Sequence, residues 1–171
     1  MERQLEKQVM SVLVDNHAGV LARVVSLFSR RGFNIDSLTV SATNNPALSR
    51  ITIVAQGDRV GMEQVIQQTA KLVETRNIVA LDTSRSLLRE LLLVKVEADE
   101  TTRGSIREIA VIYKAKIIDL SVKSMVMELT GEPSKIDAFL EVLSPYRIIE
   151  MCRTGVTALE RGSGSAEVAV F

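Results

Sequence analysis

Side chains that could bind a small charged molecule surround one predicted helix near the N-terminus. The stretch DNHAGVLARVVSLFSRRGFNI carries Asn16 and Gly19 before the helix, and Gly32 and Asn34 after it. Backbone N–H groups at a helix N-terminus are unpaired and partly positive, so they bind a carboxylate. Gly19 allows close approach to the backbone, and the amide of Asn16 can both donate and accept hydrogen bonds. We therefore expect a loop that binds a carboxylate or an ammonium, to which Asn34 adds a second amide.

Other chemistry-bearing residues are few and scattered. His17 is the only histidine and Cys152 the only cysteine, and they fall in different halves of the chain. A nucleophilic Cys–His pair is therefore not expected, and one cysteine allows neither an internal disulfide nor a cysteine-based zinc cluster. The motifs HExxH, GxSxG and GxGxxG and the Walker phosphate loop do not occur. We predict no catalytic residue and no metal ligand.

The elements around the loop follow from the spacing of apolar residues. VMSVLV has the length and valine content of a strand, whereas the apolar residues from Leu21 to Phe28 recur at i, i+3, i+4 and i+7. The first half is predicted to contain, in order, strand 9–14, a helix from Val20 to Gly32, strands 36–43 and 50–56, helix 62–73 and strand 78–82. The second half is predicted to contain strand 90–98, helix 106–113, strands 116–122 and 124–130, helix 133–143 and strand 147–152.

Two copies of a β-α-β-β-α-β order define the fold class. Right-handed crossovers place both helices of such a unit on one face of an antiparallel sheet. We therefore predict an α+β protein of two tandem ferredoxin-like domains, residues 8–83 and 90–159, with a linker at 84–89 and a flexible tail at 160–171. A small domain with a helix-free sheet face buries a limited core. A second copy that covers this face or pairs an edge strand is the simplest remedy, so a homo-oligomer is expected.

An ordinary turn is the competing explanation of the Asn/Gly loop. Asp15 or Asn16 could be only turn residues or helix caps, Gly19 only a turn glycine, and Gly32 with Asn34 an ordinary helix exit. The equivalent loop of the second half, ADETTRGS at residues 98–105, has no Asn-x-x-Gly and is followed by no Gly-x-Asn. A turn at this place in the fold therefore does not require these residues, which favours ligand binding in the first half.

Composition and charge exclude several other functions. Lys plus Arg number 21, as do Asp plus Glu, so no overall field attracts nucleic acid or anionic membranes. RNA-recognition domains share this element order but stack bases on aromatic strand residues, and aromatics make up 4% of this chain. No apolar run approaches the length of a membrane span, and the N-terminal MERQLEKQ is charged. We expect a cytoplasmic protein that contacts neither nucleic acid nor membrane.

Longer stretches resemble a known family. SVLVDNHAGVLARVVSLFSRRGFNIDSLTVSAT followed by LSRITIVAQGD is similar to the N-terminal ACT domain of acetolactate synthase (acetohydroxyacid synthase) small subunits. The similarity continues through RELLLVKVEA, KIIDLS, MELTGEPSKIDAFL and RTGVTALERG, and so covers nearly the whole chain. RxGFNIxSLTV and LSRxTI are its most specific motifs, because other ACT domains share only the fold and the loop glycine. The resemblance implies an ACT domain followed by an ACT-like C-terminal domain.

The resemblance also implies a regulatory protein without catalysis of its own. Members of the family bind a catalytic large subunit, which uses thiamine diphosphate, FAD and Mg²⁺ to convert two pyruvates into 2-acetolactate and CO₂ in branched-chain amino acid synthesis. The small subunit raises that activity and makes it sensitive to feedback by valine. No cofactor is implied for this chain, whereas a homodimer and valine, or a related branched-chain amino acid, are.

The family's effector site maps onto the loop described above. Matching the motifs, Asn16 and Gly19 would hold the effector in the strand–helix loop, and Asn34 would reach it from the neighbouring protomer. Apolar walls and backbone contacts would come from the adjoining positions Val20, Leu21, Ile35, His17 and Ala18.

Two other functions remain open at this stage. An ACT-type amino-acid sensor with a different partner would bind a ligand without activating acetolactate synthase. An acylphosphatase-like enzyme of similar topology would need an arginine in the first loop, whereas Arg23 is predicted one turn into the helix. We therefore disfavour the enzyme and keep the sensor as the alternative.

Overall fold

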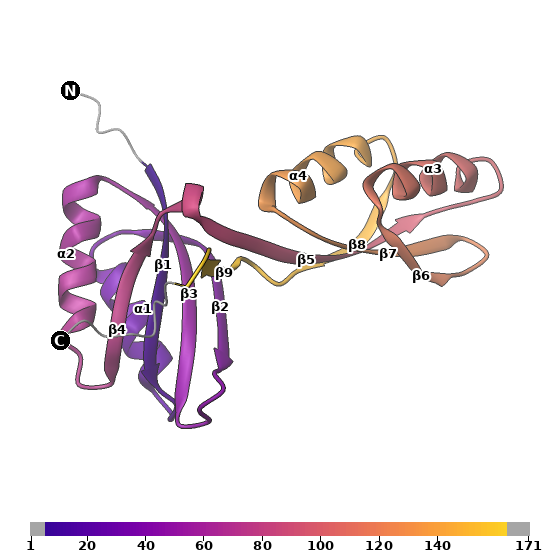
Figure 1. Cartoon of the computed structure of the whole chain (residues 1–171). Helices are drawn as coiled ribbons and strands as arrows, with labels where there is room; N and C mark the ends of the chain where they lie inside the picture. The colour runs from indigo at the N-terminus through magenta and orange to yellow at the C-terminus, as the bar shows by residue number, and fades with distance from the viewer. Residues whose placement is uncertain (1–5, 164–171) are drawn as a thin grey trace. The chain divides into compact units, whose positions relative to one another are not determined.

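A computed structural model describes residues 6–163 of the chain. The chain divides into two units, each with its own sheet and helices (Figure 1). The first unit comprises the residues up to Leu87 together with those from Val156 onward, and the second runs from Leu88 to Gly155.

The first unit is a four-stranded antiparallel sheet with two helices. Its elements are β1 (Glu6–Asp15), α1 (Val20–Arg30), β2 (Asn34–Ala42), β3 (Leu48–Gly57), α2 (Arg59–Ala70), β4 (Thr75–Leu81) and the 3-10 turn η1 (Thr83–Arg85). The strands lie in the order β2-β3-β1-β4, so β2 is an edge strand whose outer side is not paired within the described chain. This order is the ferredoxin-like arrangement predicted from the sequence.

The core of the first unit lies between the sheet and both helices. Val20, Val24 and Phe28 recur every four residues on α1 and are buried. They pack in one cluster with Met62 and Val65 of α2 and with every second residue of the central strands, namely Met10, Val12, Val14, Ile51, Ile53 and Ala55. Both helices therefore cover the same face of the sheet, as the crossover rule requires.

The second unit repeats this plan. Its elements are β5 (Ser86–Glu97), α3 (Arg103–Tyr113), β6 (Lys116–Leu120), β7 (Ser124–Gly131), α4 (Pro133–Val142) and β8 (Ile148–Arg153). The strand order β6-β7-β5-β8 matches that of the first sheet. Ile106, Ala110, Ile136 and Phe139 of the helices are buried against β5 and β7 in a separate cluster. Two tandem α+β domains, each with helices on one sheet face, are thus confirmed.

The boundary between the domains differs from the sequence-based expectation. The predicted linker at 84–89 is structured, because η1 ends at Arg85 and β5 begins at Ser86. The last strand, β9 (Thr157–Glu160), pairs with β5 and belongs to the first unit, although residues 156–159 were expected in the second domain. TALE is too short to show a clear alternation of apolar and polar residues, which is why this strand escaped prediction. Of the tail expected to be flexible, residues 164–171 lie outside the described chain.

The helix-free faces of the two sheets differ in burial. In the first unit, the residues that point away from the helices include Val9, Thr52 and Val54, and all three are buried. In the second unit, the corresponding face exposes Leu93 and Cys152 around a hollow of about 260 Å³. The first sheet is therefore covered on both faces within one chain, and the second is not.

Candidate functional site

The loop before α1 presents a helix N-terminus without a side-chain cap. Gly19 is the residue that caps α1, with a left-handed φ of 88°, and no side chain accepts a hydrogen bond from the first turn. Its carbonyl accepts the first helical hydrogen bond from the N–H of Arg23. A residue other than glycine in this conformation would be strained, which accounts for Gly19. The proposal that Asn16 or Asp15 merely caps the helix is not supported by this geometry.

Backbone donors at this helix start are not used by the chain itself. Within the described part of the chain, the N–H groups of Ala18, Gly19, Val20 and Leu21 have no hydrogen-bond acceptor. All four lie in the first turn or directly before it, where the helix dipole is positive. The loop therefore presents four unpaired backbone donors at the positive end of a helix.

The second unit offers an internal comparison, because its equivalent loop is filled by its own carboxylate. Asp99 stands four residues before the start of α3, as Asn16 stands four residues before the start of α1. One oxygen of Asp99 accepts hydrogen bonds from the backbone N–H groups of Thr101 and Thr102, both at 2.9 Å. The Thr101 hydroxyl and these backbone donors lower the pKa of Asp99 to about 2. Asn16, whose side chain is instead hydrogen-bonded to the carbonyl of Pro46, leaves the corresponding donors of the first unit free.

Asn16 is held at the tip of the neighbouring hairpin. Its side-chain amide donates to the carbonyl of Pro46 at 2.9 Å, and its backbone N–H donates to the carbonyl of Ala47 at 2.8 Å. The side chain is exposed, and its carbonyl oxygen has no donor among the described residues. Asn16 therefore fixes the loop against the β2–β3 hairpin and keeps an amide oxygen that could accept a hydrogen bond. The sequence did not reveal this role of the Pro46 hairpin.

Charged side chains beside the loop are paired with one another. Asp15 accepts two hydrogen bonds from Arg76, both at 2.7 Å, and these lower the pKa of the Asp15 carboxyl. Arg23 forms an ion pair with the largely buried Glu74. Neither arginine nor either carboxylate is therefore left as a free charge at the helix start. The unpaired positive partial charge at the helix start therefore comes from the backbone N–H groups.

Asn34 lies at the opposite end of the first unit. Asn34 pairs with Gln56 on β3, whereas Asp15, the neighbour of Asn16, pairs with Leu48. The eight positions between Leu48 and Gln56 correspond to roughly 26 Å of strand. Within one chain, Asn34 and the Asn16 loop cannot hold the same small molecule.

The side chain of Asn34 belongs to a polar cluster on its own edge. It donates to Asp36 at 3.0 Å, and Gln56 donates to the other oxygen of that carboxylate at 2.9 Å. Partial burial raises the pKa of Asp36, but hydrogen bonds from Gln56, Lys7 and Asn34 outweigh it, and the net pKa is lowered. Asn34 is thereby oriented at the start of the unpaired edge strand β2, with its carbonyl oxygen directed to no described donor.

The apolar and backbone positions of the predicted site fall into two groups. His17, Ala18 and Leu21 are exposed around the loop, Leu21 at 39%. Ile35 is half-buried next to Asn34. Val20 is 3% exposed and packs in the core, so it can contribute only its backbone N–H to a ligand. The structure thus brings together residues 16–21 and places 34 and 35 elsewhere.

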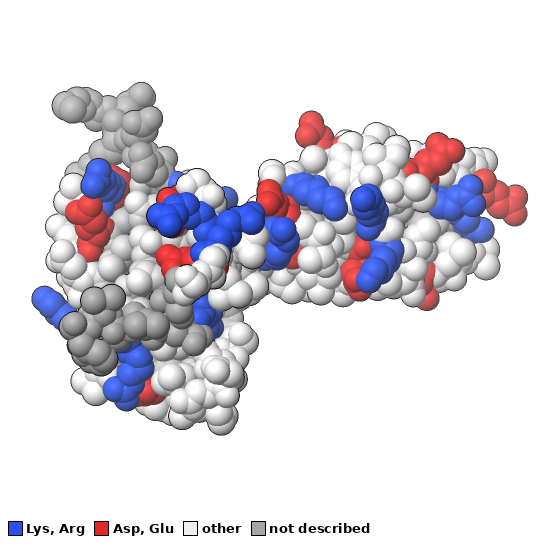
Figure 2. Space-filling view, viewed as in Figure 1, with Lys and Arg blue, Asp and Glu red and all other residues white. Residues whose placement is uncertain are grey.

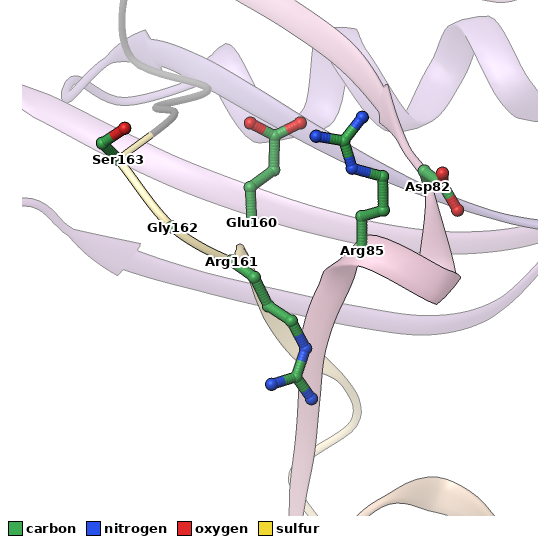
Figure 3. A pocket seen from close by; sticks show the side chains of 6 residues that line it. All are labelled: Asp82, Arg85, Glu160, Arg161, Gly162 and Ser163. Carbon is green, nitrogen blue, oxygen red and sulfur yellow. The ribbon is translucent and has the colours of Figure 1, made fainter.

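Between residues 6 and 163, no other group of side chains is arranged as an active site would be. A hollow of about 370 Å³ in the first unit is lined by two acidic and two arginine side chains, with Gly162 and Ser163 (Figure 3). The two carboxylates and two guanidinium groups that line this hollow sum to zero net charge, and its lining contains neither histidine nor cysteine. Among the described residues, no three His, Cys, Asp or Glu side chains lie together as a metal site would require. On the face shown in Figure 2, both basic and acidic residues are present on each unit.

One further absence concerns membranes. None of the helices formed by residues 6–163 combines the length and the apolar character that a membrane span needs.

Comparisons with known proteins agree with the fold and with the sequence motifs. The family model "AHAS small subunit-like ACT domain" matches residues 10–77, and the model "Small subunit of acetolactate synthase" matches residues 89–162. The acetolactate synthase small subunit of Mycolicibacterium smegmatis is 48% identical over 153 residues, 90% of each chain. That of Haemophilus influenzae is 41% identical over 157 residues, 91% of this chain and 96% of the relative.

A solved structure gives the same result. The crystal structure of the acetolactate synthase small subunit from Thermotoga maritima superposes with a TM-score of 0.86 at 38% identity, covering 93% of this chain and 99% of that one. Sequence and fold therefore agree over nearly the whole length of both proteins. The chain belongs to the acetolactate synthase small subunit family.

Proposed function

We propose that this chain is the regulatory subunit of an acetolactate synthase, which activates the catalytic large subunit and makes it sensitive to inhibition by valine. Family membership supports the partner, because a small subunit implies a large one. The observation that carries the effector site is the uncapped N-terminus of α1, whose counterpart in the second unit is filled by Asp99. The single cysteine suits the cytoplasm, where we place the protein.

The effector site would be completed by a second copy of the chain. β2 has an unpaired edge, and Val40 on it is 44% exposed. If two β2 strands pair antiparallel, the start of one strand lies opposite the end of the other. Asn34 of the second copy then lies opposite Ala42, at the end of β2 where Asn16 contacts the hairpin. The two asparagines that are far apart in one chain would thus meet across a dimer.

In this arrangement each part of valine has a partner. The carboxylate would accept hydrogen bonds from the N–H groups of residues 18–21, and the ammonium would donate to the amide oxygens of Asn16 and of Asn34 of the second copy. Leu21, with Ile35 of the second copy, would cover the isopropyl group, whose burial contributes about 1.5–3 kcal/mol. Leucine and isoleucine differ from valine by one methylene, so discrimination among the three should be modest.

Regulation then follows from binding at an interface. A ligand held by two chains stabilises one arrangement of the dimer, and it can inhibit only if the large subunit prefers another. A coupling free energy of about 1–3 kcal/mol would be sufficient. The conversion of two pyruvates to 2-acetolactate and CO₂, with thiamine diphosphate, FAD and Mg²⁺, belongs to the large subunit in this proposal.

The test is reconstitution with the large subunit from the same organism. The chain alone should show no turnover, mixing should raise the activity of the large subunit, and valine should lower it again. Calorimetry should give one valine per protomer, and the Asn16→Ala, Asn34→Ala double variant should not bind. Binding without activation would favour the alternative, an ACT-type amino-acid sensor with another partner. Activation without valine binding would refute the effector site.

A further inference from the structure

The chain that returns from the second unit is anchored on the strand that carries Asn34. We name residues 155–160, from Gly155 through β9, the return segment. The backbone N–H of Val156 donates to the Ser37 hydroxyl at 2.7 Å, and the Thr39 hydroxyl donates to the carbonyl of Val156 at 2.8 Å. The backbone N–H and the carbonyl of Val156 are therefore each hydrogen-bonded to a hydroxyl of β2. Figure 1 shows β9 next to the sheet of the first unit.

The return segment also covers the helix-free face of this sheet. Ser37 and Thr39 point away from the helices, because their strand partners Val54 and Thr52 alternate with the core residues of β3. Val156 is 4% exposed and Ala158 is 2% exposed. The contact is therefore a packed one, and the two hydroxyls set its position along β2.

The preceding residues join this anchor to the second unit. Thr154 is fixed on β5, since its N–H donates to the carbonyl of Leu91 at 3.0 Å and its hydroxyl accepts from the Leu91 N–H at 3.1 Å. Gly155, with φ of 84°, is the one residue between the Thr154 anchor and the Val156 anchor. One residue therefore separates the position held on β2 from the position held on β5.

The strand β2 is irregular between the proposed effector residues and the anchor. Its register with β3 shifts between Ile35 and Ser37, which leaves Asp36 outside the regular pairing. Such bulges bend a strand and re-aim its side chains, and β6 of the second unit carries an equivalent shift between Ile117 and Asp119. Ligand contact at Asn34 would thus act on a segment that leads directly to Ser37.

We propose that Ser37 and Thr39 are positioning residues that transmit occupancy of the effector site to the second unit through the return segment. This inference rests on the proposed function and concerns the regulation of the same site. The two hydroxyls hold the return segment but are not among the proposed effector contacts. Removing them should therefore leave valine binding intact and abolish the response of the second unit to bound valine.

Hydrogen–deuterium exchange of the full chain, with and without saturating valine, tests this inference. In the wild type, valine should slow hydrogen exchange of the backbone amides of Val156 and of β8 by about fivefold or more. About fivefold is the lower end of the change in equilibrium constant that allosteric coupling commonly produces. The Ser37→Ala, Thr39→Val variant should bind valine with an affinity close to the wild-type value, and its β8 should no longer respond. Ser41→Ala, which changes a hydroxyl on the same strand, is the control and should respond as the wild type does.

The outcomes separate this inference from the proposed function. A wild type that does not bind valine refutes the proposed function. A wild type in which valine protects β2 but leaves β8 unchanged refutes the transmission, even if the double variant proves unstable. A double variant that binds valine and retains the full response of β8 refutes the role of the two hydroxyls.

Discussion

Replacing Asn16 by aspartate should convert the first loop into the self-filled form of the second. Asn16 and Asp99 hold the same place relative to the helix that follows. An aspartate at 16 could accept from the N–H groups of Ala18 and Gly19, as Asp99 accepts from the two residues at the same spacing. The variant should therefore fold as well as the wild type but lose much of its affinity for an amino acid.

The magnitude follows from the charge that the substitution introduces. The carboxylate of a bound amino acid would lie roughly 4 Å from the new carboxylate, since both compete for the same donors. Two like charges at about 4 Å repel by about 1 kcal/mol in water and about 4 kcal/mol near a protein surface. This repulsion corresponds to a weakening of about fivefold to several hundredfold in Kd, and attraction between the new carboxylate and the ligand ammonium shifts the expected value towards the lower end. The lost amide contact to the Pro46 carbonyl adds to it.

Calorimetric titration with valine at neutral pH measures this effect. Asn44→Asp is the matched control, because it adds the same charge at an exposed position of the adjacent hairpin. The control should weaken binding only slightly, since a more distant exposed charge is screened by salt. If Asn16→Asp binds valine as tightly as the wild type does, the carboxylate is not held at the start of α1.

Three further predictions concern stability. Gly57→Ala would place a Cβ 2.2 Å from the Phe33 ring, so it should cost about 1–3 kcal/mol in urea unfolding, and Phe33→Leu should restore part of the loss. Arg153→Met leaves the carboxylate of Glu90, whose side chain is 6% exposed, without its ion-pair partner; we expect a loss of about 3–5 kcal/mol that Glu90→Gln reduces, and an unchanged midpoint would contradict the pairing. The folded pKa of Asp99, about 2, lies below its ordinary value of 3.8, so its contribution to stability is present above about pH 4 and is lost as the pH falls towards 2. Thermal unfolding of Asp99→Asn should show less of this acid dependence than the wild type.

Most of the fold could be predicted because periodicity and burial coincide. The helix from Val20 and the strand that includes Val12 were identified since their apolar residues are those that form the core. Boundaries were less exact, and β5 begins at Ser86 although its predicted start was residue 90. The return segment could not be predicted, because its position depends on hydroxyl groups of β2 more than 100 residues earlier in the chain.

The candidate site was predictable in part. Asn16 and Gly19 stood out because the second half lacks them, and the structure supplies the physical contrast in Asp99. Burial of Val20 could have been inferred from its place on the apolar stripe of α1. The distance between Asn34 and the loop depends on the register of β2 with β3, which local patterns do not fix.

The most direct test of the account is a mixed dimer made from one Asn16→Ala chain and one Asn34→Ala chain, each carrying a different purification tag. If every effector site uses Asn16 of one chain and Asn34 of the other, one site of this dimer loses both residues and the other retains both. We therefore predict one valine bound per mixed dimer with wild-type affinity, although neither variant alone binds. If the mixed dimer also fails to bind valine with wild-type affinity, the two asparagines do not meet across a dimer interface and the proposed site is wrong.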